Sequence, residues 1–371
     1  MTERILITGG AGFIGRHVAS ALLSEGDDVR VLDSLIDQVH GGRTHPQGLG
    51  PDVEFIQGDV RDADLVRKAL DRVDAVIHLA AEVGVGQSMY AVERYVSVND
   101  LGTATLMQAL IEHPVRRVVV ASSMSIYGEG LYHDEDGALV EDVERAPRLA
   151  ETPSWDPLDS WGRPLFPLPT PEWKHPALAS VYALTKYAQE RMTLTVAAAY
   201  GIEYAALRLF NVYGPGQALS NPYTGVLAIF ASRLANGQRP MIFEDGKQRR
   251  DFVHVADVAR AFALALRSPR AIGQAFNIGS GQDRSVCEVA AKLARSMGRR
   301  DIEPEITGKA RTGDIRHCFA DVGKARAQLK FSAQRDFDEG MAELAEWVAS
   351  QEARDRVQDA RRELEIRGLV A

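Results

Sequence analysis

Near its start the chain reads ILITGGAGFIG, from Ile5 to Gly15, and this stretch decides the fold. Apolar and β-branched residues precede the glycines, and the residues after them carry apolar side chains at three- and four-residue spacing. The order predicts a buried strand, a tight turn and an amphipathic helix. Gly9, Gly12 and Gly15 stand three residues apart, and glycine permits positive φ and a close approach of the backbone to a neighbouring group.

The glycine turn is a candidate phosphate site. Free amides at a helix start and the helix dipole attract anions, and a glycine turn between strand and helix is typical of dinucleotide binding. The predicted contacts with a dinucleotide are Gly9, Gly12, Phe13, Ile14 and Gly15. Taken alone, the glycines also suit a plain strand-to-helix turn. The rest of the chain provides the context that decides between the two.

Beyond the turn, β-branched runs alternate with helical patterns, which indicates βαβ units and a parallel sheet. The predicted strands are Arg4–Thr8, Asp28–Asp33, Val53–Gln57, Ala75–Leu79, Arg117–Ser122, Tyr204–Phe210 and Gln274–Ile278. The predicted helices are Ile14–Ser24, Ala63–Leu70, Val98–Glu112 and Ala179–Tyr200. Right-handed crossovers make this an α/β protein with a doubly wound Rossmann-type parallel sheet, whose ligands bind at the carboxyl ends of the strands.

The expected organisation has two lobes. A dinucleotide-binding domain covers residues 1–204, and a smaller mixed α/β substrate lobe covers 205–371, with strands returning to the sheet near 204–210 and 274–278. Residues 129–175 break the alternation, because eight of the sixteen prolines and three of the four tryptophans lie there or at its border. The prolines predict an irregular insertion, and the aromatics predict a packed flap. Helical spacing with many charges from Asp338 to Leu364 is typical of a solvated surface helix.

Composition excludes several classes. The 371 residues are 45% hydrophobic and 25% charged, as in ordinary globular proteins. A net charge of −8 without a long basic run argues against nucleic acid as a partner. Cys287 and Cys318 fit neither a disulfide framework nor a cysteine metal site, and no metal is predicted. Without a signal peptide or an apolar run of about 18 residues, we expect a cytoplasmic protein that does not contact membranes.

Two carboxylates follow the second and third strands. Asp33 lies about twenty residues after the glycine turn, where an acid accepts hydrogen bonds from the adenosine ribose and repels a 2′-phosphate. This favours NAD over NADP, although Asp33 would equally suit the start of a loop. Asp59 and Val60 follow the third strand, in a position to meet the adenine, and this pair also suits any turn.

The motifs together resemble the extended short-chain dehydrogenase/reductase family, in particular its nucleotide-sugar epimerases and dehydratases. The resemblance runs from Ile5 to about Asp321, without the insertion, and includes His78-Leu79-Ala80-Ala81 and Asn99-x-x-Gly102-Thr103. It implies that Leu79, Ala80, Ala81 and Asn99 support the cofactor end of the pocket. His78 by itself is more typical of a buried core histidine.

A tyrosine and a lysine four residues apart share one helical face at Tyr182 and Lys186. A phenol with an ordinary pKa of about 10 must lose its proton to act as a base, and an ammonium and a positive nicotinamide both favour that loss. Lys186 is also a candidate contact of the nicotinamide ribose. The family pattern places the catalytic hydroxyl four residues before Tyr127, at Ser123. Ser122, a candidate cofactor contact, is the alternative.

The two residues after Ser123 separate the possible reactions. In 4,6-dehydratases of the family this stretch resembles Thr-Asp-Glu, because elimination of water needs an additional acid and base. Here the residues are Met124 and Ser125, which cannot exchange a proton usefully at neutral pH. The sequence therefore favours oxidation and reduction at one carbon, with Ser125 as a candidate substrate contact.

The resemblance also implies a site for the diphosphate of a nucleotide sugar. In Asn211-Val212-Tyr213-Gly214 the asparagine matches the family's contact to the diphosphate-sugar. Arg250 and Arg311 match its phosphate arginines, and Asp314 its contact to the nucleoside ribose. Guanidinium groups suit phosphate oxygens through paired charged hydrogen bonds. The alternatives are an ion pair of Arg250 with Asp251 and a solvated loop at Arg311.

The predicted function is an NAD-dependent nucleotide-sugar 4-epimerase that oxidises its substrate transiently to a 4-keto sugar and returns the hydride to the opposite face. The alternatives are a 4-keto-sugar reductase and a catalytically silent NAD-binding sensor. The insertion resembles that of a subgroup of epimerases of dTDP-L-rhamnose, although this chain lacks cysteines that some of them carry. A dTDP-6-deoxyhexose and a UDP-hexose are the candidate substrates, and the family implies a homodimer.

Overall fold

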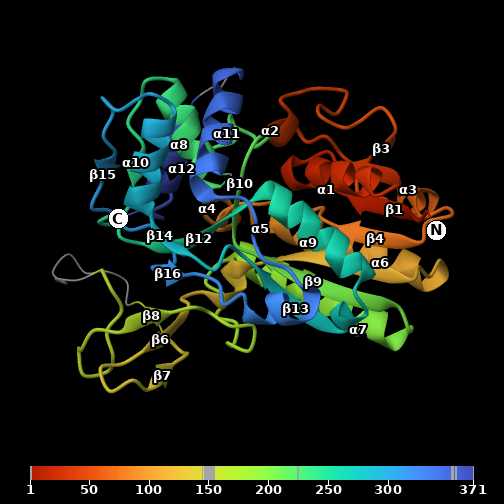
Figure 1. Ribbon diagram of the computed structural model, residues 1–371, viewed down its shortest axis with the longest axis horizontal. Coiled ribbons are helices and arrows are strands. Elements are labelled where there is room, and N and C mark those ends of the chain that lie inside the picture. Colours follow the sequence, from red (N-terminus) through yellow and green to blue (C-terminus); the bar gives the residue numbers. More distant parts are fainter. Residues whose placement is uncertain are drawn as a thin grey trace.

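The computed structural model describes residues 2–143, 145, 155–223, 225–351, 355 and 357–370 (Figure 1). A seven-stranded parallel sheet forms the centre. Its strands, in spatial order, are β13 (Gln274–Ile278), β9 (Glu203–Leu209), β5 (Arg117–Ser123), β4 (Ala75–His78), β1 (Arg4–Thr8), β2 (Asp28–Asp33) and β3 (Glu54–Gln57). The chain reverses its direction of travel across the sheet between β1 and β4, so the crevice for a ligand opens where these strands end.

Helices cover both faces of the sheet because successive side chains of each strand point to opposite sides. Ile5 and Ile7 pack under α1 (Phe13–Ser24) and α9 (Val255–Arg267). Leu6, between them, packs on the opposite face. The helices on that face are α3 (Ala63–Ala69), α6 (Gly102–Glu112) and α7 (Val181–Ala199). The doubly wound architecture predicted from the sequence is confirmed.

The predicted strands agree with the observed ones to within one residue at each end. One helix differs from its prediction: the segment expected at Val98–Glu112 begins as a π-helix, η1 (Val96–Leu101), which follows α5 (Val92–Tyr95) and continues into α6. The remaining short helices around the sheet are α2 (Asp37–His40), α4 (Val85–Ser88), η2 (Met124–Tyr127), η3 (Pro269–Ala271) and η4 (Ala325–Leu329). In the described part of the chain, no helix is both long enough and apolar enough to cross a membrane.

A smaller group of elements lies beyond the carboxyl ends of the strands (Figure 1). It contains the strands β10 (Asn211–Tyr213), β12 (Arg249–His254), β14 (Asp283–Ser285), β16 (His317–Cys318), β11 (Met241–Ile242) and β15 (Glu305–Ile306), and the helices α8 (Val226–Ala235) and α10 (Val286–Ser296). In β16, Cys318 is buried in a cluster with Ile126 and Phe210, at the junction with the central sheet. This group positions the strands that carry the predicted substrate contacts.

The insertion is more regular than expected. Its described residues form a three-stranded antiparallel sheet of β6 (Leu131–His133), β7 (Leu139–Val140) and β8 (Phe166–Leu168). Tyr132 and Leu165 form a small core of their own. The prolines misled the sequence interpretation, because the strands are only two or three residues long and β8 contains a proline itself, Pro167. Residues 146–154 lie outside the described part.

The prediction of a solvated helix from Asp338 to Leu364 is wrong. Two helices are present, α11 (Phe337–Ala349) and α12 (Val357–Ile366), and each buries one face. Met341 and Leu344 of α11 are fully buried against α8 and α10. Ala360 and Leu364 of α12 are also buried. The charged residues occupy the other faces, so the same spacing produced amphipathic packing rather than full solvation.

Close packing at Gly15 gives the first prediction. A side chain at this position would place Cβ 2.4 Å from Gly10 Cα, and backbone atoms cannot move aside as a flexible side chain can. We expect Gly15→Ala to lower the free energy of unfolding by about 1–3 kcal/mol, measured by urea titration. Gly50→Ala is the matched control, because its nearest neighbour would be Leu23 Cδ1 at 3.7 Å. Equal stability of the two variants would contradict this packing argument.

Candidate active site

A cavity of about 830 Å³ opens at the carboxyl ends of the central strands. One end is lined by the glycine turn and Asp33, and the other extends past Arg250 and Arg311. This volume suits a dinucleotide and part of a second ligand. The cavity therefore joins residues that lie more than two hundred positions apart in sequence.

The glycine turn fits a pyrophosphate. Gly9 has φ +70°, and a side chain there would come within 2.7 Å of the Ala80 backbone nitrogen. Asp33 at the end of β2 accepts hydrogen bonds from the amides of Ala11 (3.0 Å) and Leu35 (2.9 Å), so its carboxylate is held in place at the cavity wall. The turn and this fixed acid are the residues that would hold the pyrophosphate and the adenosine ribose of NAD.

The other predicted cofactor residues divide into two groups. The cavity lining includes Phe13, Ile14, Val60, Leu79, Ala80, Ala81 and Ser122. Asp59 also lines it, and hydrogen bonds from Arg61 lower the pKa of its carboxyl. Asn99 does not reach the cavity: it is fully buried, accepts from the Glu82 amide at 2.7 Å and donates to Thr185 Oγ1 at 2.9 Å. It holds the loop after β4 against α7, behind the lining.

The predicted catalytic groups meet in the middle of the cavity. Ser123 ends β5, and Tyr182 lies in the first turn of α7, whose start is capped by the Ser180 hydroxyl accepting from the Ala183 amide. Burial raises the pKa of the Tyr182 phenol, and its hydrogen bond with Ser123 opposes this. Ser125 Oγ donates to Ser123 Oγ at 2.9 Å. The serine hydroxyl is thus held where it can share a proton with the phenol.

Lys186 lies one turn after Tyr182 and also lines the cavity. Burial lowers the pKa of its ammonium to about 7, with Glu190 acting in the opposite direction. Its Nζ donates to Gln189 Oε1 at 2.7 Å. We expect the Lys186 ammonium and a positive nicotinamide to favour the phenolate together. Among the groups of this chain, the hydrogen bond with Ser123 lowers the phenol pKa.

His78 is a structural residue, as the sequence indicated. Burial lowers the pKa of its imidazole to about 3, assisted by the charge of Lys186, so the ring is neutral. Hydrogen bonds join its two nitrogens to Thr8 Oγ1 (2.6 Å) and Thr103 Oγ1 (2.9 Å). The ring connects β1, β4 and α6 under the cavity floor.

A buried ion pair fixes the spacing between β5 and α7. Arg208 of β9 binds Glu190 of α7 at 2.7 Å, and both side chains are buried. The same guanidinium donates to the Tyr127 hydroxyl at 2.8 Å, and Tyr127 donates to Asn277 Oδ1 at 2.7 Å. Tyr127 ends the short helix that begins just after Ser123. The pair therefore connects the segment that carries Ser123 with the helix that carries Tyr182.

The chemistry at the centre of the cavity is limited by its side chains. Met124 and Ser125 line it next to Ser123. Glu82 is the carboxylate on the neighbouring loop, and Arg94 neutralises it through an ion pair of 2.7 Å. Among the described residues at this position, none provides the acid and base pair that elimination of water requires. The arrangement supports a proton transfer through Tyr182 and Ser123.

The two predicted phosphate arginines both line the far part of the cavity. Arg250 of β12 donates to the carbonyls of Arg249 and Arg316 at 2.9 Å each, and also to that of Ile315. Arg311 Nη2 donates to Asp314 Oδ1 at 2.6 Å, and its Cζ lies 5.3 Å from the centre of the Phe243 ring. Arg311 Nε is buried without an acceptor among the described residues. An anion between the arginines would complete these contacts.

Buried polar atoms without partners gather on the same walls. In the described residues, Asn211 Oδ1, Gln217 Oε1 and Gln248 Oε1 accept no hydrogen bond although they are buried and belong to lining residues. An unsatisfied buried acceptor costs about 1–3 kcal/mol. These amides therefore suit a ligand rich in hydroxyl donors, such as a sugar. Asp314, which pairs with Arg311, lines the cavity beside them.

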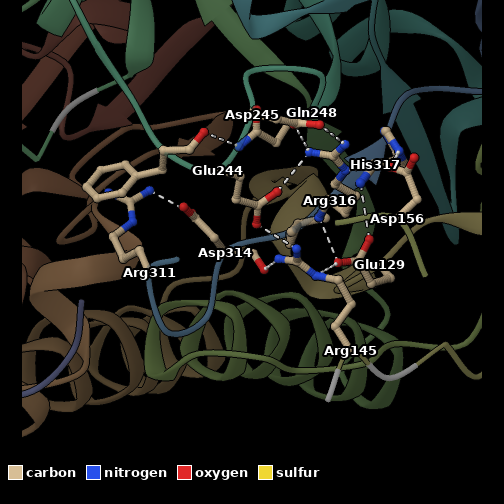
Figure 2. Close-up of polar contacts among 12 residues, drawn as sticks. Glu129, Arg145, Asp156, Glu244, Asp245, Gln248, Arg311, Asp314, Arg316 and His317 are labelled. Carbon is tan, nitrogen blue, oxygen red and sulfur yellow. Dashed lines mark hydrogen bonds and ion pairs between the residues drawn. The ribbon is translucent and has the colours of Figure 1, made fainter. Parts of the chain in front are cut away.

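The insertion braces the phosphate side of the cavity (Figure 2), and none of its described residues lines that cavity. Arg145 binds Glu129 at 2.9 Å and Glu244 at 2.6 Å, and it donates to the Asp314 carbonyl at 2.6 Å. Arg316, which is fully buried, binds Glu244 from the other side at 2.9 Å. Contacts with the insertion and with Arg316 therefore fix the backbone around Glu244 and Asp314, close to Arg250 and Arg311.

Three parts of the site were missed by the sequence interpretation. Phe243 is a single aromatic residue before a turn, and nothing in its neighbours marks it as a ring beside an arginine. The amides Gln217 and Gln248 are common loop residues. Helix α12 contributes Arg361 and Leu364 to the lining, and the spacing of its apolar residues was the signal that could have revealed it.

A single cavity that accommodates a dinucleotide and a second anionic ligand places this chain among the dinucleotide-dependent enzymes of the Rossmann type. The sequence profile of the NAD dependent epimerase/dehydratase family matches residues 5–148 and 167–279. The chain belongs to this family. The resemblance predicted from the motifs is confirmed, and residues 149–166, which the profile leaves out, fall in the insertion.

Several nucleotide-sugar enzymes are similar over almost the whole chain. The dTDP-L-rhamnose 4-epimerase of Burkholderia thailandensis is 37% identical, with 94% of this chain and 96% of that protein covered. The UDP-glucose 4-epimerase of Thermotoga maritima, solved with UDP-glucose, is 30% identical with a TM-score of 0.76, covering 94% of this chain and 99% of that one. The UDP-glucose 4-epimerase of Thermus thermophilus, solved with NAD, is 30% identical with a TM-score of 0.74, covering 94% and 100%.

The contact of Ser123 with Tyr182 predicts a pH effect. Because this hydrogen bond lowers the phenol pKa, Ser123→Ala should raise that pKa and move the acidic limb of the kcat profile to higher pH. We also expect kcat at the optimum to fall by about 100-fold. Ser122→Ala is the comparison variant, measured over the same pH range. A shift of the acidic limb in Ser122→Ala and not in Ser123→Ala would show that the catalytic hydroxyl belongs to Ser122 and that its assignment to Ser123 is wrong.

The arginines predict a defect in substrate binding. Arg250→Met should raise KM for a nucleotide sugar by about 10- to 100-fold, since a charged hydrogen bond contributes about 1.5–3 kcal/mol, and bound NAD should be retained. Arg249→Met is the control, because Arg249 pairs with Asp283 and lies outside the lining. Steady-state kinetics of both variants give the comparison. An unchanged KM for Arg250→Met would rule out its role in phosphate binding.

Proposed function

We propose that this protein is an NAD-dependent nucleotide-sugar 4-epimerase. The observation that carries the proposal is the pairing of Tyr182 with Ser123 at the middle of one cavity, between the glycine turn and the two arginines. Bound NAD would accept a hydride from the sugar and return it. Membership of the NAD-dependent family and the 4-epimerases among its relatives support the same conclusion.

The residues of the chain have distinct tasks in this reaction. Tyr182 takes the proton of the sugar hydroxyl, and Ser123 hydrogen-bonds the same oxygen. Lys186 and Asp33 hold the two ribose groups of the cofactor. Arg250 and Arg311 hold the diphosphate, so binding energy far from the reacting carbon keeps the substrate in place while its sugar turns.

The proposed substrate is a dTDP-6-deoxyhexose, with UDP-hexoses as the second candidate. The similarity to a dTDP-L-rhamnose 4-epimerase over 94% of the chain supports the first, and the similarity to UDP-glucose 4-epimerases supports the second. A reductase acting in one direction has less support, because the relatives that are similar over 94% of this chain include enzymes named as 4-epimerases. A catalytically silent NAD-binding sensor would not need Tyr182, Ser123 or Lys186.

A homodimer is also proposed. Helices α5 and α7 and the π-helix η1 expose apolar side chains at Val92, Val96, Leu101 and Leu184, each at least 40% accessible. Burial raises the pKa of the Asp100 carboxyl, in the same surface, to about 6. A second copy covering this surface would remove the exposed apolar area from water. The cytoplasmic location remains a prediction from the sequence.

Purified protein assayed with dTDP- and UDP-sugars, without added cofactor, tests the function. We expect epimer formation detected by NMR or mass spectrometry. Tyr182→Phe should retain NAD and lose at least about 100-fold in turnover, because the base is removed. Tyr187→Phe, on the same helix but outside the cavity lining, is the control. Consumption of added reduced cofactor would establish the reductase instead, and normal turnover by Tyr182→Phe would refute the catalytic assignment.

A further inference from the structure

The cavity does not end at the arginines. Beyond Arg311 it continues to an apolar end whose floor includes Met241, Ile242 and Phe243 of the substrate lobe. Its opposite wall is α12, which contributes Ala360, Leu364 and, at its polar border, Arg361. This helix belongs to the segment that the sequence indicated as a solvated surface.

We propose that α12 binds the nucleoside of the nucleotide sugar, with Ala360 and Leu364 against the flat base and Arg361 at its polar edge. The proposal rests on the nucleotide-sugar function given above. With the reacting sugar at Tyr182 and the diphosphate between Arg250 and Arg311, the nucleoside is the part of the substrate that remains, and it has to extend into the space past the arginines.

The tail is attached on both sides of this space. The Thr312 amide donates to the Leu369 carbonyl at 3.0 Å, so the end of the chain pairs with the backbone next to Arg311. Lys309 binds Glu365 at 3.1 Å. On the opposite side, the Arg367 guanidinium lies 4.5 Å from the centre of the Tyr90 ring. The helix is therefore held at a fixed position over the cavity.

The lining side of α12 combines an apolar surface with one guanidinium group. Leu364 is buried. A side chain added at Gly86 of α4 would come within 3.5 Å of the Leu364 methyl groups, so Leu364 lies close to α4 in the first lobe. Arg361 Nε donates to Glu365 at 2.8 Å and Nη1 to Met241 Sδ at 3.7 Å. Its Nη2 finds no acceptor among the residues that the structure describes, and a carbonyl oxygen of a base could accept from it.

The helix offers matched pairs for the test. Leu364 is buried, whereas Ile366, of the same size, is 72% exposed. Arg361 lines the cavity, whereas Arg362 is exposed. Leu364→Ala and Arg361→Ala should each weaken binding of thymidine diphosphate and uridine diphosphate by about tenfold and raise KM similarly, with kcat within about twofold. Ile366→Ala and Arg362→Ala should bind as the unchanged protein does.

Inorganic pyrophosphate, titrated calorimetrically in parallel, separates the nucleoside contact from an indirect effect through Arg311. Because it has no nucleoside, its affinity should be the same in Leu364→Ala and in the unchanged protein. Equal losses for pyrophosphate and nucleoside diphosphates, or equal behaviour of Leu364→Ala and Ile366→Ala, would overturn the proposal. If nucleoside diphosphates bind as expected but no sugar is epimerised, the function fails while the nucleoside site stands.

Discussion

The ion pair between Arg208 and Glu190 is the interaction on which the site depends. It lies in the interior, where removal of one partner leaves an uncompensated charge and costs about 3–5 kcal/mol. Through Tyr127 and Asn277 the same guanidinium connects β9 to the segment after β5 and to β13. The distance between a serine at a strand end and a tyrosine on a helix is therefore set by a rigid polar cluster, which loops alone could not maintain.

The phosphate side uses a second cluster of the same kind. Glu244, which has φ +55° and is almost fully buried, stands between Arg145 and Arg316. One arginine comes from the insertion, and the other from the segment just before β16, whose carbonyls at Ile315 and Arg316 accept from Arg250. The insertion thus contributes to the cavity by fixing its wall, and a change in the insertion can alter substrate binding without touching the substrate.

Much of this could be predicted from the sequence, because strands and glycine turns are determined locally. The period of apolar residues identified the central strands, and the family motifs identified Ser123, Tyr182 and both arginines as residues that share one cavity. The motif did not reveal that Asn99 supports the cofactor end of the pocket from behind its lining, since a motif does not show which way a buried amide points. Helix α12 was misjudged because its apolar residues are few and its partners lie far away in sequence, at Gly86 and Met241.

The buried thiol of Cys318, at the junction between the lobes, determines how this junction responds to oxidants. Burial raises its pKa to about 12, while the Thr170 hydroxyl 3.8 Å away acts in the opposite direction. Oxidants and alkylating agents attack thiolates, which this side chain does not form near neutral pH. Burial also raises the pKa of Cys287. Peroxide levels that inactivate enzymes with acidic thiols should therefore leave this junction chemically intact.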